Sequence, residues 1–291
     1  MQQLDNEKQK SIKNFFLFEL FWFLLAQVLG IFVSHNVVVQ FAERGEKIQQ
    51  VLPSEFSIPQ FLISFFGVVV FILLISKFFK GKNIIFKTFF AFVIFLGGEV
   101  FFESFIPTII ALPIVLILIF FWFKTSSVWF HNLLLVLSIA GIGGFVGSSL
   151  SPQIVILLFF ILAIYDLVSV YKTKHMIKMA KSMMESQAVL GIIIPKRFAD
   201  FNKKLKEVKI GDEKKDFLVL GSGDIIFPLI LAASFLPQSQ GLFKSGIILI
   251  FSLFGLLFGF WLFLKLGKKP MPALPPLAFF CIIGYFIAIL I

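Results

Sequence analysis

The sequence predicts an all-helical protein that crosses a membrane nine times, and its composition and hydropathy pattern both point there. Of its 291 residues, 59% are hydrophobic and 14% are charged, whereas a soluble domain carries roughly a quarter charged residues. The mean hydropathy is +0.99. Apolar runs long enough to cross a bilayer recur along the whole chain between short polar breaks, which indicates a bundle of spanning helices.

The nine predicted spans form a single transmembrane domain over residues 1–291. In order they are Phe15–Phe41, Ile58–Phe79, Ile84–Phe105, Pro107–Phe123, Trp129–Leu150, Pro152–Tyr171, Phe217–Leu236, Phe243–Leu266 and Pro272–Ile291. Spans one to six occupy residues 15–171, a long charged loop occupies residues 172–216, and spans seven to nine occupy residues 217–291. The first run is too long for the core of a signal peptide, so we expect it to stay as a helix.

The basic residues predict which side of the membrane each loop faces. With the N-terminus in the cytoplasm, 23 of the 26 lysines and arginines fall in the inside segments. The three others are Arg44, Lys47 and Lys244. Because cytoplasmic loops are enriched in lysine and arginine, this asymmetry favours nine spans, an inside N-terminus, an outside C-terminus and a cytoplasmic 172–216 loop.

Several other functions find little support in the sequence. The net charge of +10 is explained by membrane topology, so no nucleic-acid partner is expected. A single cysteine, Cys281, and three widely separated histidines suggest neither a metal site nor a cofactor. Gly143 and Gly147, like Gly255 and Gly259, have the spacing of close helix packing rather than that of a dinucleotide-binding loop.

Acidic residues inside the spans need an explanation, because a charge in hydrocarbon costs a few kcal/mol. Glu19, Glu99 and Glu103 lie near helix ends, where we expect them to reach the interface or pair with a basic residue. Asp166 and Asp224 differ from these. They lie about 8 Å and about 10 Å from the inner ends of consecutive antiparallel helices, so they are expected at similar depth and can face each other.

Two facing carboxyl groups in a low-dielectric site favour a state in which one proton is shared. That state suits peptide hydrolysis. The ionised carboxylate takes a proton from water, and the protonated carboxyl polarises the scissile carbonyl.

The residues around the aspartates strengthen this interpretation. Asp224 ends the segment Gly221-Ser222-Gly223-Asp224, whose glycines remove side-chain bulk beside the acid. Asp166 follows Tyr165, whose hydroxyl could gate the site or hydrogen-bond near it. The last span opens with Pro270-Met271-Pro272-Ala273-Leu274-Pro275-Pro276, and four prolines in seven residues cannot form regular helix.

These three motifs resemble those of the presenilin and signal peptide peptidase family. Tyr-Asp in the sixth span, Gly-x-Gly-Asp in the seventh and Pro-Ala-Leu at the start of the ninth occur in the family's order and on its helices. The resemblance implies a presenilin-like fold, most like the archaeal or microbial members. It also implies intramembrane aspartyl proteolysis by Asp166 and Asp224.

The resemblance implies substrate-positioning roles for Tyr165 and for the residues around Asp224 and in the last span. These are Gly221, Ser222, Gly223, Pro272, Ala273 and Leu274. The branch of the family stays open, since Ile225-Ile226-Phe227-Pro228 favours the signal peptide peptidase side and the predicted topology is that of presenilins.

The expected substrates are therefore membrane-embedded peptides or proteins, including signal peptides, cut by an integral protein of a prokaryotic cell membrane. An extended backbone edge, supplied in part by the Pro272 segment, would present the unwound substrate. Whether the chain forms homo-oligomers is left open. The alternative function is a transporter or cation-leak channel that uses the same carboxylates as ion or proton sites. Such proteins often show inverted repeats, and none is evident here.

Overall fold

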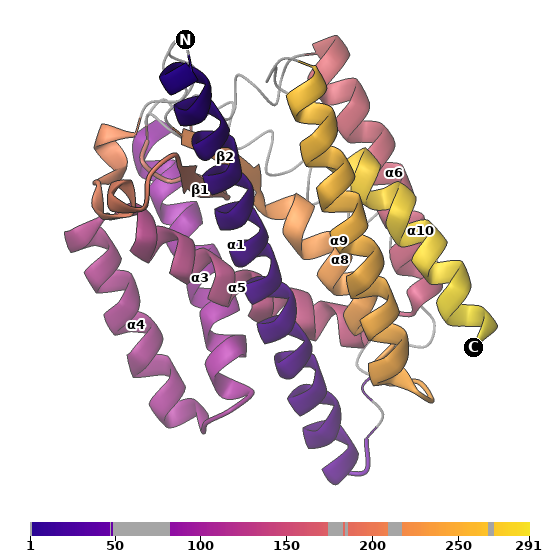
Figure 1. The fold of residues 1–291 in the computed structure, drawn as a ribbon. Helices are drawn as coiled ribbons and strands as arrows, with labels where there is room; N and C mark the ends of the chain where they lie inside the picture. The colour runs from indigo at the N-terminus through magenta and orange to yellow at the C-terminus, as the bar shows by residue number, and fades with distance from the viewer. Residues whose placement is uncertain are drawn as a thin grey trace.

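The computed structural model describes residues 2–46, 48, 82–173, 183, 186–208, 217–266 and 271–291. The α-helices are α1 (Gln2–Glu43), α3 (Lys82–Glu103), α4 (Thr108–Thr125), α5 (Val128–Ser149), α6 (Pro152–Val168), α8 (Ser222–Ala233), α9 (Gly241–Lys265) and α10 (Leu274–Leu290) (Figure 1). A π-helical turn, Ser169–Thr173, extends α6. Two strands, β1 (Gly191–Pro195) and β2 (Phe217–Gly221), pair antiparallel.

The mainly helical fold agrees with the prediction, but the count of nine helices is not confirmed. Each of the eight described α-helices overlaps one predicted span, and the second predicted span, Ile58–Phe79, lies outside the described residues. Five of the described helices are long and apolar enough to cross a membrane: α1, α4, α5, α6 and α9. α8 and α10 are shorter apolar helices.

α5 lies at the centre of the bundle, where it contacts α1, α3 and α8. Two glycines allow α8 to approach it closely. A Cβ atom on Gly147 would lie 2.5 Å from the Cβ of Ala233, and one on Gly143 would lie 2.7 Å from a methyl group of Leu229. A larger residue at Gly147 would clash with Ala233 and the backbone of Ile230, and one at Gly143 would displace the Leu229 side chain. This confirms the expectation that these glycines serve close helix packing.

The glycines of α9 seat the beginning of α10 in the same way. A Cβ atom on Gly255 would lie 2.8 Å from the Cα of Leu277, and one on Gly259 would lie 3.3 Å from the ring of Pro276. α10 also contacts α6 and α8. The beginning of α10 is therefore packed closely against α9.

The predicted helical span Phe217–Leu236 is wrong at its start. Its first five residues form β2, and α8 begins only at Ser222. β2 pairs with β1, whose sequence Gly-Ile-Ile-Ile-Pro is rich in the β-branched residues typical of strands. An apolar run of this length suits a buried strand as well as a buried helix, so its pattern cannot separate the two. The long-range pairing with β1 makes it a strand.

The 172–216 loop contains folded structure besides β1. Two short 3₁₀ helices, Phe198–Asn202 and Leu205–Glu207, follow the strand. The backbone N–H of Leu205 donates to the carbonyl of Ser126 at 2.8 Å, between α4 and α5. This part of the loop is therefore attached to the ends of the helices.

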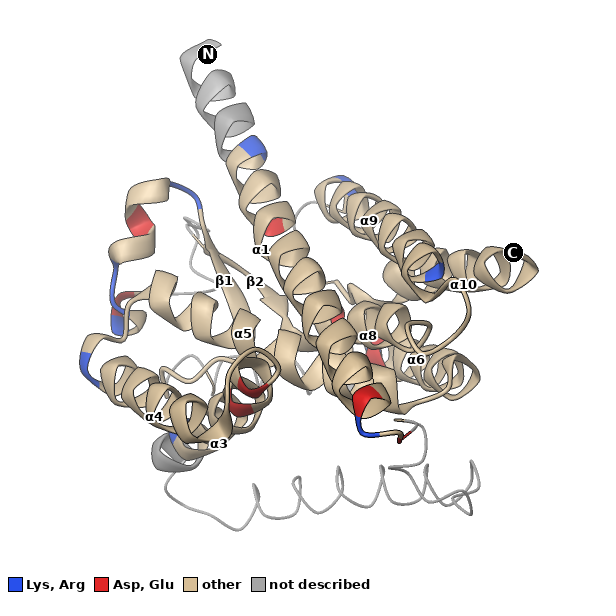
Figure 2. Ribbon diagram, turned by 90° about the horizontal axis from the view of Figure 1, so that it is seen from below, with Lys and Arg blue, Asp and Glu red and all other residues tan. Residues whose placement is uncertain are grey.

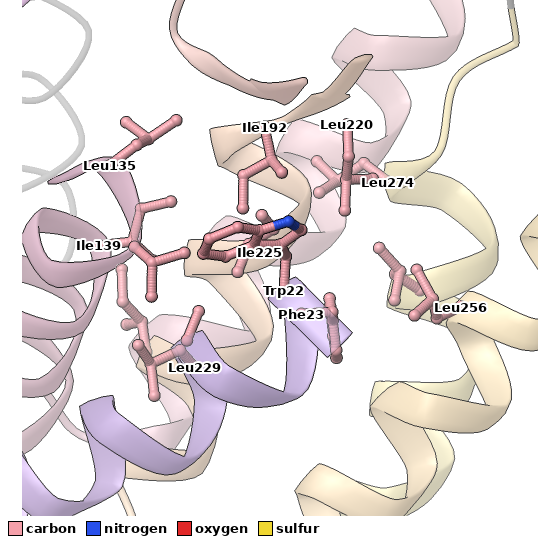
Figure 3. Packing of buried hydrophobic residues seen from close by; sticks show 14 of the residues in the cluster. Trp22, Phe23, Leu135, Ile139, Ile192, Leu220, Ile225, Leu229, Leu256 and Leu274 are labelled. Atoms are coloured by element: carbon pink, nitrogen blue, oxygen red, sulfur yellow. The ribbon is translucent and has the colours of Figure 1, made fainter. Parts of the chain in front are cut away.

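The β1–β2 hairpin belongs to the main hydrophobic core. Ile192 and Leu220 lie directly opposite each other in the hairpin, and both are buried. Figure 3 shows them beside Trp22 of α1 and Ile225 of α8. Described lysines and arginines gather at helix ends and in loops, as Figure 2 shows, so the bundle between these ends is largely free of positive charge.

Candidate active site

Asp166 lies near the C-terminal end of α6 and is 7% exposed. Its Oδ2 atom accepts a hydrogen bond of 3.3 Å from the backbone N–H of Leu274. Leu274 is the first residue of α10, where N–H groups have no partner within their own helix. Pro275 and Pro276 follow it, have no N–H and suit a first helical turn. The positive end of the α10 dipole thus faces the Asp166 carboxylate.

Asp224 reaches the site by another route. It lies in the first turn of α8, immediately after β2, and is 8% exposed. A carboxylate is stabilised at this end of a helix by the free N–H groups and the helix dipole. The backbone of Gly221, which is the last residue of β2, lies against the Asp224 carboxylate.

The two carboxyl groups are close enough for their charges to interact. This proximity follows from the contacts of α6, α8 and α10 with one another. Each carboxylate lies at the N-terminal end of a helix, Asp166 against α10 and Asp224 within α8. Two nearly buried acids at such a site favour a state with one proton between them.

In the Gly221-Ser222-Gly223 segment, the space for a side chain is smaller at Gly221 than at Gly223. A Cβ atom on Gly221 would lie 3.0 Å from Oδ2 of Asp224, so a side chain there would press on the carboxylate. A Cβ atom on Gly223 would meet only the ring of Phe227, at 3.8 Å. Among the described residues, Gly223 therefore borders open space next to the acid.

The Pro272-Ala273-Leu274 motif lies at the site through its last residue. Pro272 and Ala273 precede α10, outside regular helix, and Leu274 donates its N–H to Asp166. The expectation that four prolines exclude regular helix holds for Pro272. Pro275 and Pro276 instead occupy the first turn of α10, where proline is tolerated.

Among the described residues, the Tyr165 hydroxyl makes no hydrogen bond to either aspartate. Its side chain is 55% exposed, and within the described part of the chain no residue hydrogen-bonds to that hydroxyl. Tyr165 is adjacent to Asp166 in sequence, but consecutive residues point to different sides of a helix.

α1 contributes two polar residues that the sequence did not assign to the site. Gln27 is 1% exposed, and its Nε2 donates to the carbonyl of Ile225 at 2.8 Å. Ile225 directly follows Asp224 in α8, so this bond attaches α1 to the helix turn next to the acid. Glu19, two turns before Gln27, was expected to reach the interface or pair with a basic residue. Among the described residues it has no ion pair, and its charge interacts with that of Asp224.

Asn132 of α5 is the other polar residue that sequence reasoning missed. It is fully buried, and its side chain makes two hydrogen bonds to the backbone of Ile193 in β1. The available signal was a polar pair, His131-Asn132, inside a mainly apolar helix. His131 is also fully buried and stacks on Phe90. In the described part of the chain, no group of three or more His, Cys, Asp or Glu side chains could hold a metal ion.

A family model described as signal-peptide peptidase, presenilin aspartyl protease matches residues 20–291. The chain belongs to this family. Membership makes it an aspartic endopeptidase of the intramembrane type, integral to a lipid bilayer and acting on membrane-embedded substrates.

Solved structures show the same fold. A presenilin family intramembrane aspartate protease in a C222 crystal form is 21% identical, with a TM-score of 0.57 over 92% of this chain and 94% of that chain. A structure in a P2 crystal form is also 21% identical, with a TM-score of 0.53 over 91% and 96%. A search of curated protein sequences finds no significant match.

Proposed function

We propose that Asp166 and Asp224 are the catalytic pair with which this protease hydrolyses peptide bonds of transmembrane or signal-peptide segments. The observation that carries the proposal is the junction of α6, α8 and α10. There, two nearly buried carboxyl groups interact electrostatically, and each lies at the N-terminal end of a helix. Binding to helix N-termini keeps a carboxylate in a bilayer without a lysine or arginine beside it.

The chemistry follows from one proton shared by two carboxyl groups. The ionised carboxylate removes a proton from a water molecule as the water oxygen bonds to the scissile carbonyl carbon. The protonated carboxyl hydrogen-bonds to the carbonyl oxygen and stabilises the negative charge that develops there. When the tetrahedral intermediate collapses, the C–N bond breaks and a proton passes to the leaving nitrogen. No metal or organic cofactor is needed for this sequence.

We further propose that the substrate binds along the outer edge of β2, the edge that does not pair with β1. The N–H and C=O of Ile193 both bond to Asn132, so they point away from β2. Opposite residues of an antiparallel pair alternate between bonding and non-bonding pairs. Ile193 and Val219 are opposite each other, so the N–H and C=O of Val219 also point outward.

Val219 therefore offers backbone groups to another strand. Among the described residues it has no hydrogen bond outside the hairpin, and it is 37% exposed. A spanning substrate must unwind to be cut, and an extended segment could replace its lost bonds by pairing with this edge. Because β2 leads directly into the turn that carries Asp224, the paired segment would lie beside the acids. In this proposal the Pro272 segment lies beside the extended substrate, on the side where Asp166 is.

The proposed topology keeps the N-terminus and the 172–216 loop in the cytoplasm and the C-terminus outside, in a prokaryotic cell membrane. The asymmetry of basic residues supports this orientation. It puts the β1–β2 hairpin and both aspartates toward the cytoplasmic side.

Cleavage of a single-span test substrate by the purified protein in lipid vesicles tests the proposal. Asp166→Asn and Asp224→Asn keep side-chain size and remove acid chemistry, so neither variant should yield products at the parent's sites. Glu103→Gln, an acid of α3, serves as the matched control and should cut like the parent. If the parent cuts nothing and carries ions through vesicles even with both Asn substitutions, the proposal is wrong.

A further inference from the structure

The strand β1 has a polar partner inside the apolar bundle. Nδ2 of Asn132 donates to the carbonyl of Ile193 at 2.7 Å, and the N–H of Ile193 donates to Oδ1 of Asn132 at 2.9 Å. Both residues are 0% exposed. A side-chain amide has the same donor and acceptor as a peptide group. Asn132 therefore occupies the place that one residue of a third strand would take.

The rest of the outer edge of β1 is also unsuited to strand addition. Pro195 lies two residues after Ile193, so its nitrogen faces the same edge, and it has no N–H to donate. Gly191, two residues before Ile193 on the same edge, lies beside the fully buried His131. This edge of the hairpin faces α5 and is closed.

The outer edge of β2, unlike that of β1, is partly exposed. Val219 is 37% exposed, whereas Ile193 across from it is 0% exposed. Edge strands generally need such protection against unwanted pairing. Here one edge is protected by Asn132, and in the described part of the chain the other is not.

We propose that Asn132 is a positioning residue that fixes where the substrate is cut. Its two hydrogen bonds fix Ile193 of β1 to helix α5. Because β1 pairs with β2, they also fix the position of β2, the strand that precedes Asp224. Asp166 lies on a different element, α6. The placement of the β2 edge relative to both acids therefore depends on the hairpin. This inference rests on the proposed function.

Loss of the two Asn132 bonds would release the hairpin from α5. A shift of one strand along its partner by two residues keeps the same side chains on the buried face. A hairpin no longer bound to α5 could therefore hold β2 in more than one position relative to the acids. A substrate paired with β2 would then present a different peptide bond to the acids. A purely structural asparagine predicts another result, in which less enzyme is folded but the folded enzyme cuts at the same bonds.

The test compares products of a single-span substrate by mass spectrometry, with the full-length enzyme in vesicles. Asn132→Leu removes both bonds to Ile193. Asn132→Asp, protonated in this fully buried site, keeps the acceptor for the Ile193 N–H and replaces the amide donor with an O–H of different geometry. Asn14→Leu is the control, because Asn14 also donates to a loop carbonyl, that of Lys196, at 3.2 Å. We expect Asn132→Leu to raise the share of secondary products about fivefold, Asn132→Asp to raise it less, and Asn14→Leu to leave it unchanged.

The outcomes separate this inference from the proposed function. A parent enzyme that does not cut overturns both. A parent that cuts, together with Asn132 variants that give the parent's products in the parent's ratio, overturns the positioning role alone. If Asn132→Leu does not fold, the Asn132→Asp product ratio decides, with an unchanged ratio counting against the inference.

Discussion

Asp166 and Asp224 reach the same junction from opposite ends of their helices. Asp224 lies in the first turn of α8 and is stabilised by its own helix. Asp166 lies in α6, well before the continuous helix ends at Thr173, so its own helix offers it no free N–H group. α10 compensates by directing the N–H of Leu274 at Asp166. A local element thus holds one acid, and a distant segment of the chain holds the other. Substitutions on the two sides should consequently have different effects.

Among the substitutions that leave both acids in place, Gly221→Ala on the Asp224 side should have the largest effect. Gly221 has an ordinary φ of −62°, so alanine causes no backbone strain, but its Cβ would lie 3.0 Å from Oδ2 of Asp224. A displaced carboxylate should lower kcat about 100-fold. Gly223→Ala, which only fills space near Phe227, should raise KM and leave kcat nearly unchanged. Steady-state kinetics separate the two, and equal effects of both variants on kcat would contradict the contact argument.

On the Asp166 side, Gly255→Leu should lower kcat about tenfold or more, since a hydrogen bond to a charged group is lost. The added side chain would push Leu277 away and move the Leu274 N–H from Asp166. Gly246→Leu on the same helix is the control, because a Cβ there meets nothing within 4 Å. Turnover and thermal stability should both fall in Gly255→Leu alone. Parent-like turnover by that variant would show that the α10 contact is dispensable.

α1 supports the Asp224 side through Gln27. Gln27→Leu leaves the carbonyl of Ile225 without its side-chain donor, and we expect cleavage to fall about fivefold. Gln40→Leu removes a bond of the same kind, to Ser104 at 3.3 Å, far along the same helix. Initial rates measured at matched amounts of folded enzyme should fall only for Gln27→Leu. A similar drop in Gln40→Leu would indicate a general effect on α1.

Tyr165→Phe should have the smallest effect. The hydroxyl has no hydrogen bond within the described residues, and the side chain is 55% exposed. Cleavage should stay within about twofold of the parent, as expected for a substitution away from any specific interaction. A loss of tenfold or more in kcat would mean that the hydroxyl joins the site only when substrate is bound.

Much of the architecture could be predicted because bilayer physics leaves few choices. Long apolar runs become helices, and small residues such as Gly143 and Gly255 lie where helices meet. The resemblance assigned a substrate-positioning role to the Pro272-Ala273-Leu274 motif, and its last residue contacts Asp166. The facing of Asp166 and Asp224 stays a prediction, and the contacts between α6 and α8 place their helices next to each other.

The missed features depend on contacts between distant residues. β2 was expected to be helix, because an apolar run reveals a strand only once its partner β1 is known. The bonds of Asn132 to Ile193 and of Gln27 to Ile225 join residues 61 and 198 positions apart. A lone buried amide in an apolar helix shows that some partner must exist. It does not show which one.

The pairing of Asp166 and Asp224 is tested most directly by a double-mutant cycle on cleavage. Turnover of one single-span substrate is compared among the parent, Asp166→Asn, Asp224→Asn and the double variant. Groups that act as one unit are grossly non-additive, so each single variant should lose roughly a thousandfold or more in kcat. The double variant should then be no worse than either single one. Substantial turnover by either single variant, or losses that multiply in the double variant, would contradict a shared catalytic pair.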